Sequence, residues 1–252
     1  MAFTTHPIYV VLRPEQHAVL GESEFGMAGL TAIESIGPFT GIRESGPLIT
    51  VHDSTIDAHM GIGHHPHRFN ERLFYIEHGE LDHDDALNKI TGHMDAGDVG
   101  EFTEGRRGMI HSEWNNGDID TLAYILVYRT DPVPERTSFS ALRDADAPRY
   151  DEGAGVHTKE LVGPASPLQV HGDIRYFADS QLAEDAAVSL AFDDGEGGLA
   201  SVREGAVHVD DDPAELTAGT TILVRPAAGE RRLEMRSSRP SRVVRVVHGP
   251  GS

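Results

Sequence analysis

Short apolar runs alternate along the chain with clusters of glycine, proline, asparagine and aspartate. The runs rich in Val, Ile, Leu, Tyr and Phe cover residues 72–81, 121–129, 188–192, 221–226 and 241–249. The intervening clusters typical of turns include residues 96–98, 115–118 and 193–198. Apolar runs of this length between turn signals predict β-strands, and many short strands predict a sandwich or barrel. No long segment has the 3.6-residue period of an amphipathic helix, so we expect an all-β fold.

The strand-like runs fall on both sides of a polar, proline-containing stretch at residues 130–153, which we interpret as a linker. A length of 252 residues allows one large domain or two small ones. We therefore predict two β-barrel, jelly-roll-like domains, the first over residues 1–140 and the second over residues 141–252. The histidines of the second half are scattered and lack a histidine or glutamate at i±2, so this domain is expected to carry no metal: His157, His171, His208 and His248.

The charge and composition exclude several classes of function. Forty-one acidic residues against 21 basic ones give a formal net charge of −20, which would repel a phosphate backbone and makes nucleic-acid binding an unexpected function. The absence of cysteine excludes disulfides and thiolate chemistry. The first residues lack the features of a signal peptide, and no run of about 18 apolar residues could span a membrane. We expect a cytoplasmic protein.

The segment GIGHHPHRFN contains two histidines, His65 and His67, separated by one proline. In a strand, residues i and i+2 point to the same face, so the two imidazoles are expected to project together. A second pair with this spacing, His111 and Glu113, follows in GMIHSEWNN. Two neighbouring strands of this kind would supply three imidazoles and one carboxylate, a set that suits a first-row transition metal. The proline favours a sheet edge or the mouth of a barrel.

Each pair also has a simpler interpretation when it is taken alone. Histidine-rich segments of acidic proteins are often solvated loops, and an isolated HSE sequence is weak evidence for a ligand pair. The presence of both pairs, with several predicted strands between them, favours a shared site. His64 is expected to point outward. His83 is interpreted as a surface residue, with an inward position beside the site as the alternative.

These residues resemble the pirin family of the cupin superfamily. The family's HPHRGFE, GELEHRDS and GRGIVHSE segments correspond here to HPHRFNE (65–71), GELDHDDA (79–86) and RRGMIHSE (106–113). The chain departs from the pattern at Phe69, Asn70 and Arg106, which replace a glycine, a phenylalanine and a proline. The specific resemblance covers residues 61–115.

The resemblance implies a bicupin fold and a metal site in the first barrel. Carried over residue by residue, the ligands would be His65, His67, His111 and Glu113, holding one divalent transition metal, expected to be Fe(II). The glutamate of the cupin first motif falls at Glu71, which becomes a candidate pocket acid beside Glu113, the candidate catalytic base.

Three functions follow from the resemblance. The first is a dioxygenase of quercetin 2,3-dioxygenase type that acts on a small enolic or flavonol-like substrate with O2. The second is a non-enzymatic, iron-dependent regulator that binds a transcription factor or a metabolic enzyme, for which the acidic surface would suit a basic protein partner. The third is a barrel that holds its metal only structurally. We take the dioxygenase as the leading hypothesis.

Overall fold

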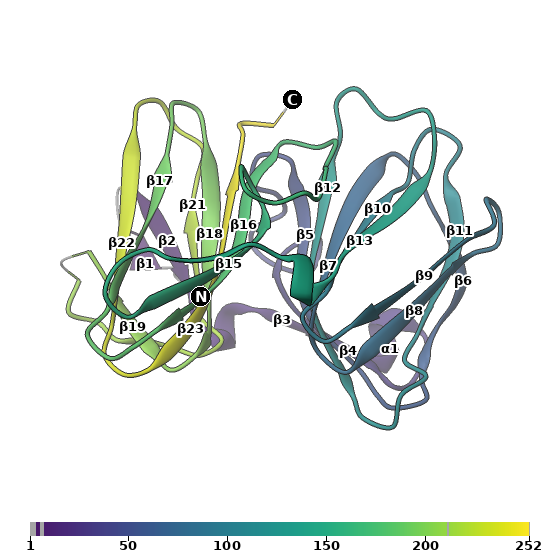
Figure 1. Cartoon of the computed structure of the whole chain (residues 1–252), viewed down its shortest axis with the longest axis horizontal. Coiled ribbons are helices and arrows are strands. Elements are labelled where there is room, and N and C mark those ends of the chain that lie inside the picture. The colour runs from purple at the N-terminus through teal and green to yellow at the C-terminus, as the bar shows by residue number, and fades with distance from the viewer. Residues whose placement is uncertain (1–3, 6–7, 211, 252) are drawn as a thin grey trace. The chain divides into compact units, whose positions relative to one another are not determined.

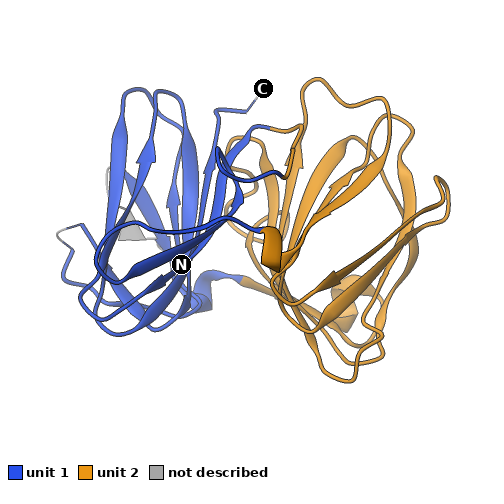
Figure 2. Ribbon diagram, in the orientation of Figure 1, with its two compact units in different colours: residues 1–17, 147–167, 173–252 blue, residues 18–146, 168–172 orange. Residues whose placement is uncertain are grey.

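The structure, a computed structural model, describes residues 4–5, 8–210 and 212–251 and is built almost entirely of antiparallel β-strands (Figure 1). The chain separates into two compact units (Figure 2). Unit 2 comprises Ala18–Asp146 and Leu168–Gly172, and unit 1 comprises Met1–His17, Ala147–Pro167 and Asp173–Ser252. The predicted all-β class is therefore confirmed.

Unit 2 consists of two sheets with an apolar core between them. The larger sheet has the order β13 (Ser138–Leu142), β10 (Val99–Thr103), β7 (Asn70–His78), β12 (Thr121–Arg129), β5 (Leu48–Ile56), β4 (Leu30–Ile36) and β3 (Ala18–Leu20). The smaller sheet has the order β6 (Gly61–His67), β11 (Met109–Trp114), β8 (Glu80–Asp85) and β9 (Ile90–Asp95). A single short helix, α1 (Glu22–Phe25), lies between β3 and β4 in sequence. Side chains from both sheets fill the core, among them Phe74, Phe102, Leu81 and Met109.

Unit 1 repeats the two-sheet plan. Its larger sheet has the order β1 (Thr4–Thr5), β2 (Tyr9–Leu12), β21 (Thr221–Val224), β18 (Gly197–Glu204), β23 (Ser241–His248), β16 (Ile174–Leu182), β15 (Val156–Val162) and β14 (Arg149–Asp151). Its smaller sheet has the order β17 (Ala187–Phe192), β22 (Arg231–Ser237), β19 (Ala206–Val209) and β20 (Leu216–Thr217). Two 3-10 turns, Pro14–Gln16 (η1) and Asp144–Asp146 (η2), complete the elements.

The units differ from the division expected between residues 140 and 141. Residues 9–12 form β2 and pair with β21, so the start of the chain belongs to the C-terminal unit. The stretch 130–153 was interpreted as a linker, and this is wrong for much of its length. Its residues 138–142 form β13, which pairs with β10 and extends the first barrel, and residues 149–151 form β14. The apolar runs lie in strands, although Gly79 divides the run 72–81 between β7 and β8, and β12 matches its prediction residue for residue.

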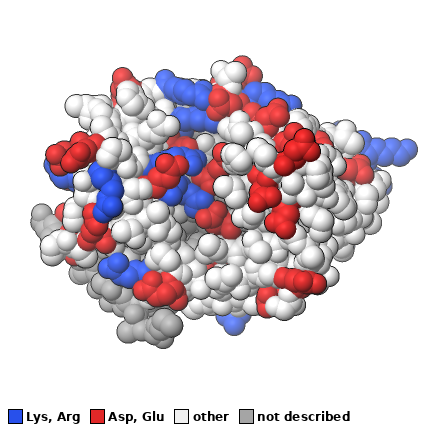
Figure 3. Space-filling view, turned by 90° about the horizontal axis from the view of Figure 1, so that it is seen from below, with Lys and Arg blue, Asp and Glu red and all other residues white. Residues whose placement is uncertain are grey.

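The surface mixes charges of both signs. On the face shown in Figure 3, acidic and basic side chains are interspersed, with no continuous patch of one sign. Exposed ion pairs of the protein include Arg106–Glu135 and Arg129–Glu44. Among the residues that the structure describes, no helix has the length and apolar character needed to cross a membrane.

The carboxylate of Asp85 holds the end of β8 against β11. Asp85 is fully buried, and it accepts hydrogen bonds from the backbone N–H groups of Leu87 and Asn88 and from the Asn88 side chain. It also accepts one from the backbone N–H of Ile110, at 3.1 Å. Because Ile110 precedes His111, which lies opposite Asp85 in the ladder, this carboxylate fixes the backbone on which His111 is mounted.

We expect Asp85→Ala to lower the free energy of unfolding by about 3 kcal/mol, because the substitution leaves several buried N–H groups without an acceptor. Urea denaturation of the metal-free protein measures this. Asp84→Ala is the matched control, since that side chain is half exposed and pairs only with His64 in the ion pairs described; its effect should stay within about 0.5 kcal/mol. Equal effects of the two substitutions would contradict the role of Asp85.

Candidate metal centre

The two predicted ligand pairs lie on adjacent strands of the smaller sheet of unit 2. His65 and His67 belong to β6, and His111 and Glu113 belong to β11. The strands are antiparallel, with His111 directly opposite His65. Since alternate residues of a strand share a face, this register brings all four side chains to the same side of the sheet.

The three imidazoles form a compact triangle. Their ring centroids are 4.7 Å apart for His65 and His67, 4.6 Å for His65 and His111, and 5.0 Å for His67 and His111. One ring nitrogen from each histidine lies within 4.8 Å of the other two. Such spacing allows three nitrogens to face a common point.

Glu113 lies close to the three imidazoles, next to a β-bulge in the pairing of β6 with β11. The register with β6 shifts between His111 and Glu113, so that Glu113 lies opposite Ile62. Its carboxylate oxygens lie 3.3 Å from Nε2 of His111 and 3.9 Å from Nε2 of His65. The extra residue of the bulge lies on β6, so the alternation of β11 is unbroken and Glu113 shares the face of His111.

Contacts behind the histidines fix the orientation of two of the rings. Nδ1 of His65 lies 2.9 Å from the carbonyl oxygen of Gly63, which places a proton on Nδ1 and leaves Nε2 to face the site. Nδ1 of His67 lies 2.6 Å from Nη2 of Arg72, whose Nε donates to Glu104 at 2.7 Å. The Glu104 side chain is fully buried, so Arg72 is held in place behind His67.

Burial keeps the imidazoles neutral. It lowers the pKa of His67 to about 2, with Arg72 and His65 adding to the shift, and it lowers the pKa of His65 and of His111 below the ordinary range. Burial also raises the pKa of Glu113 to about 7, partly offset by the charge of Arg72. At neutral pH the site therefore offers unprotonated nitrogens and a carboxyl group that is close to ionisation.

These four residues fit a bound cation. Nε2 of His67, both ring nitrogens of His111 and Oε2 of Glu113 are buried and have no hydrogen-bond partner among the described residues. A buried polar atom without a partner is costly, and one such atom from each of these three side chains calls for a common ligand. Three nitrogens and a carboxylate oxygen are donors that first-row transition metals accept.

A cavity of about 690 Å³ opens beside the histidines. His65, His67 and Glu113 line it at one place, together with Asn70 and Arg72 from β7. Most of the remaining wall is apolar and includes Phe25, Leu30, Ile49, Ile62, Phe74 and Ile125. The volume and lining are those of a site for a small, largely apolar molecule.

The structure does not bring Glu71 to this cavity, so its prediction as a pocket acid is corrected. Asn70 and Arg72, its neighbours on β7, line the cavity, and alternation therefore sends Glu71 to the other face of the sheet. There its carboxylate accepts hydrogen bonds from the backbone N–H groups of His171 and Gly172. The neighbouring Glu101 carboxyl, buried beside Glu71, has its pKa raised to about 9. Glu71 therefore anchors the segment 168–172 to the barrel.

Two residues beside the site were misjudged or missed from the sequence. His83 is buried, with its ring 4.7 Å from Phe102 and 5.2 Å from His111, so the surface interpretation is wrong and the inward alternative is right. Burial lowers its pKa to about 4. Arg72 was not singled out, although its position two residues from Phe74 would have placed it on the inner face of β7.

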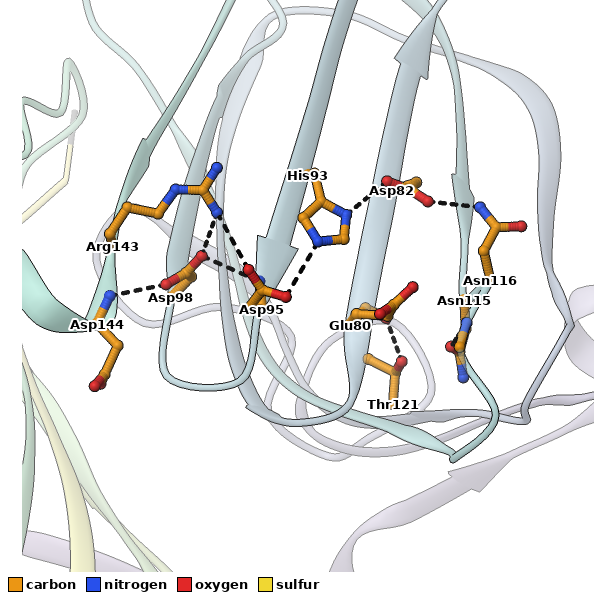
Figure 4. Close-up of polar contacts among 11 residues, drawn as sticks. Glu80, Asp82, His93, Asp95, Asp98, Asn115, Asn116, Thr121, Arg143 and Asp144 are labelled. Atoms are coloured by element: carbon orange, nitrogen blue, oxygen red, sulfur yellow. Dashed lines mark hydrogen bonds and ion pairs between the residues drawn. The ribbon is translucent and has the colours of Figure 1, made fainter.

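A second group of ligand-type side chains lies on the surface of the smaller sheet (Figure 4). Here His93 lies between two carboxylates, with Nδ1 2.7 Å from Asp82 and Nε2 3.1 Å from Asp95. Both contacts raise the pKa of His93. Both ring nitrogens already face carboxylate oxygens, and these contacts favour the protonated ring, which has no lone pair for a metal.

Comparisons with known proteins agree with this geometry. Residues 22–127 match the family described as Pirin, a range that includes all four candidate ligands. The quercetin 2,3-dioxygenase of Escherichia coli (strain K12) is 28% identical over 151 residues, which are 56% of this chain and 58% of that protein. The chain thus matches a little over half the length of this relative.

Solved structures share the whole fold. The crystal structure of GK1651 from Geobacillus kaustophilus superposes with a TM-score of 0.80 at 20% identity and covers 96% of each chain. Bacterial pirin YhhW from Escherichia coli, in complex with nickel(II), gives a TM-score of 0.76 at 17% identity, over 96% of this chain and 100% of that one. The predicted bicupin fold and the resemblance to pirins are confirmed.

The pKa of Glu113 leads to a test on metal-free protein. The folded state retains a proton up to about pH 7, whereas the unfolded chain releases it near 4.5. This contribution to stability is therefore present at low pH and is lost as the pH rises through about 7. Glu113→Gln removes this titrating group. The free energy of unfolding of the variant, relative to that of wild type, should therefore rise by about 2–3 kcal/mol between pH 5 and pH 8.

Urea denaturation at the two pH values measures the difference. Glu135→Gln serves as the control, because that side chain is 81% exposed and the substitution should give the same stability difference at both pH values. A Glu113→Gln difference that does not change with pH would show that the carboxyl group titrates normally.

Proposed function

We propose that this chain, whose residues 22–127 match the family described as Pirin, is a metal-dependent dioxygenase of quercetin 2,3-dioxygenase type. The substrate would be a small enolic or flavonol-like molecule, with O2 as the second substrate. The ligands would be His65, His67, His111 and Glu113, and the catalytic base would be Glu113. The name of the Escherichia coli relative supports this class of reaction.

The observation that carries the proposal is the position of unpartnered donor atoms beside an apolar cavity. Nε2 of His67, the ring nitrogens of His111 and Oε2 of Glu113 lack partners among the described residues, and His67 and Glu113 also line the cavity. A structural metal site is normally closed by protein ligands, whereas a catalytic site retains access for a substrate. Access from a cavity of substrate size favours the catalytic alternative.

When bound, a divalent ion would act as a Lewis acid toward an enolic oxygen and provide a place for O2. The protein's own residues prepare the substrate. Glu113 lies in the cavity wall, where its carboxylate is placed to accept the proton of an enolic hydroxyl. The guanidinium of Arg72, also in the wall, stabilises the negative charge that remains on the substrate.

We propose Fe(II) as the ion, because a dioxygenase of this type requires a metal that can exchange electrons with O2. The donor set itself also accepts manganese, nickel, copper and zinc. The apolar lining of the cavity supports the reaction by limiting the access of water to the substrate.

The first test concerns metal binding. Protein purified without a nickel column should contain about one equivalent of iron or a similar ion by elemental analysis. His65→Ala and His111→Ala should each lose most of this metal, because each substitution removes one of the four donors. A wild-type protein that contains no metal and takes up neither Fe(II), Mn(II) nor Ni(II) would contradict the proposal.

Surface histidines provide the controls. His64 is exposed and pairs with Asp84, and His93 lies between Asp82 and Asp95. His64→Ala and His93→Ala should therefore keep the metal content of wild type.

The second test concerns turnover. Glu113→Gln keeps the size of the side chain and an oxygen that can contact a metal, but it removes the base. Oxygen consumption with quercetin should fall by a factor on the order of 10² or more, the usual scale for the loss of a general base, while iron remains at least partly bound.

Two outcomes would change the assignment. If iron-loaded wild type consumes no oxygen with quercetin or related enols, the dioxygenase proposal fails and the regulatory alternative takes its place. If turnover occurs and Glu113→Gln leaves it intact, the proton acceptor is another group.

A further inference from the structure

The cavity beside the candidate metal centre has a second polar position, formed by His52. This residue lies on β5 and lines the cavity, and its side chain is 17% exposed. Its Nε2 is 2.9 Å from an oxygen of Glu34, its neighbour on β4. The proposed reaction at the metal centre leaves this pair without a role.

The Glu34 carboxylate is built into the barrel wall. Its side chain is 1% exposed, and its other oxygen accepts a hydrogen bond from the backbone N–H of Phe39 at 2.8 Å. A Cβ atom on Gly37 would lie 2.2 Å from the carboxyl carbon, so the absence of a side chain at position 37 makes room for this group. A carboxylate enclosed in this way holds the imidazole of His52 in one orientation.

This contact also determines which hydrogen bonds His52 can make. The carboxylate accepts, so Nε2 carries a proton in this contact, and the tautomer with its proton on Nε2 leaves Nδ1 as an acceptor. A ligand group that pairs with Nδ1 must therefore donate, as a hydroxyl does. An ether oxygen at the same place has no proton to donate, so it could not form a hydrogen bond with Nδ1, which also accepts.

His52 and the candidate metal ligands line the cavity from different sheets. His52 lies on β5 of the larger sheet, whereas the candidate ligands lie on β6 and β11 of the smaller sheet. Sheets that pack face to face lie about 10 Å apart. The wall beside His52 is apolar at Ile125 and Val127. A ligand that contacts both His52 and the metal therefore spans the space between the two sheets.

We propose that His52 binds a hydroxyl group at the end of the ligand remote from the candidate metal centre, so that the cavity selects a planar, mainly apolar phenol. The proposal rests on the function proposed above, because it assumes that the other end of the ligand carries the metal-binding oxygens. His52 acts here as a specificity-determining residue, and Glu34 as a positioning residue that acts through it.

The test compares matched ligands in binding rather than in turnover. Metal-loaded protein is titrated without O2 with 3-hydroxyflavone, which has only the metal-binding oxygens, and with derivatives that add one hydroxyl at position 7 or 4′. For wild type, one of these derivatives should bind about 3- to 10-fold more tightly than the parent, the scale of one additional hydrogen bond. His52→Phe should bind the parent normally and lose this preference.

Two further variants separate recognition from packing. Glu34→Gln replaces the acceptor by a group that can also donate to Nε2, which allows the proton of His52 to move to Nδ1. The ratio between the affinities for the hydroxyl derivative and for the methoxy derivative with the same ring position should then fall about 3-fold or more. A purely structural role of the pair would not change this ratio. His78→Phe is the control, because His78 is exposed on β7 and contacts the carbonyl oxygen of Asp120; it should keep the wild-type preference.

The outcomes distinguish the two proposals. Equal affinity of wild type for the parent and both hydroxylated derivatives, or a preference that persists in His52→Phe, overturns the role of His52 even where oxygen is consumed. A preference that depends on His52 without oxygen consumption, once air is admitted, supports this inference and overturns the dioxygenase. If no flavonol binds, both proposals fail.

Discussion

The antiparallel pairing of β6 with β11 is the constraint on which the candidate site depends. It places His111 opposite His65, and the alternation of each strand then brings His67 and Glu113 to the same side. Neither strand could keep this register alone, because an isolated two-stranded ribbon is marginally stable in water. The register is held from outside, by β8 and by the Asp85 carboxylate on one flank of β11. The site is thus a local consequence of the packing of the whole smaller sheet.

The same packing sets the chemistry of the site. Burial removes water from the imidazoles and the carboxyl group. It therefore favours their neutral forms and leaves several ring nitrogens and a carboxyl oxygen without hydrogen-bond partners among the described residues. A folded protein tolerates such a cost when the surrounding structure supplies enough stability, and the apolar core of unit 2 lies next to these residues. Arg72 adds a permanent positive charge behind His67, fixed by the buried Glu104. The candidate site therefore combines neutral imidazoles with a cationic wall, an environment suited to an anionic oxygen ligand.

Much of this could be predicted from the sequence, because the decisive signals are local. Strand identity follows from apolar runs between turns, and the i, i+2 spacing of His65 and His67 gives their common face. Glu71 shows a case in which a motif gives the wrong position. The cupin first motif placed Glu71 in the pocket, whereas alternation with Arg72 along β7 sends it to the opposite face of the sheet. The position of β13 and the buried state of His83 depend on partners far along the chain, and the residues themselves carry no record of such pairing. The pairing of β2 with β21 in the C-terminal sheet could not be predicted for the same reason.

The pairing of β2 with β21 affects the order in which the two units fold during synthesis. Residues 18–146, which make up most of unit 2, leave the ribosome long before β21, the partner of β2, has been made. The N-terminal barrel can therefore close early, while the apolar YVVL segment of β2 has only the short strand β1 beside it until the C-terminal sheet forms. An apolar strand with an unpaired edge is prone to associate with other chains. Selection on this protein should thus act on the rate at which its last strands join, in addition to the stability of the finished fold.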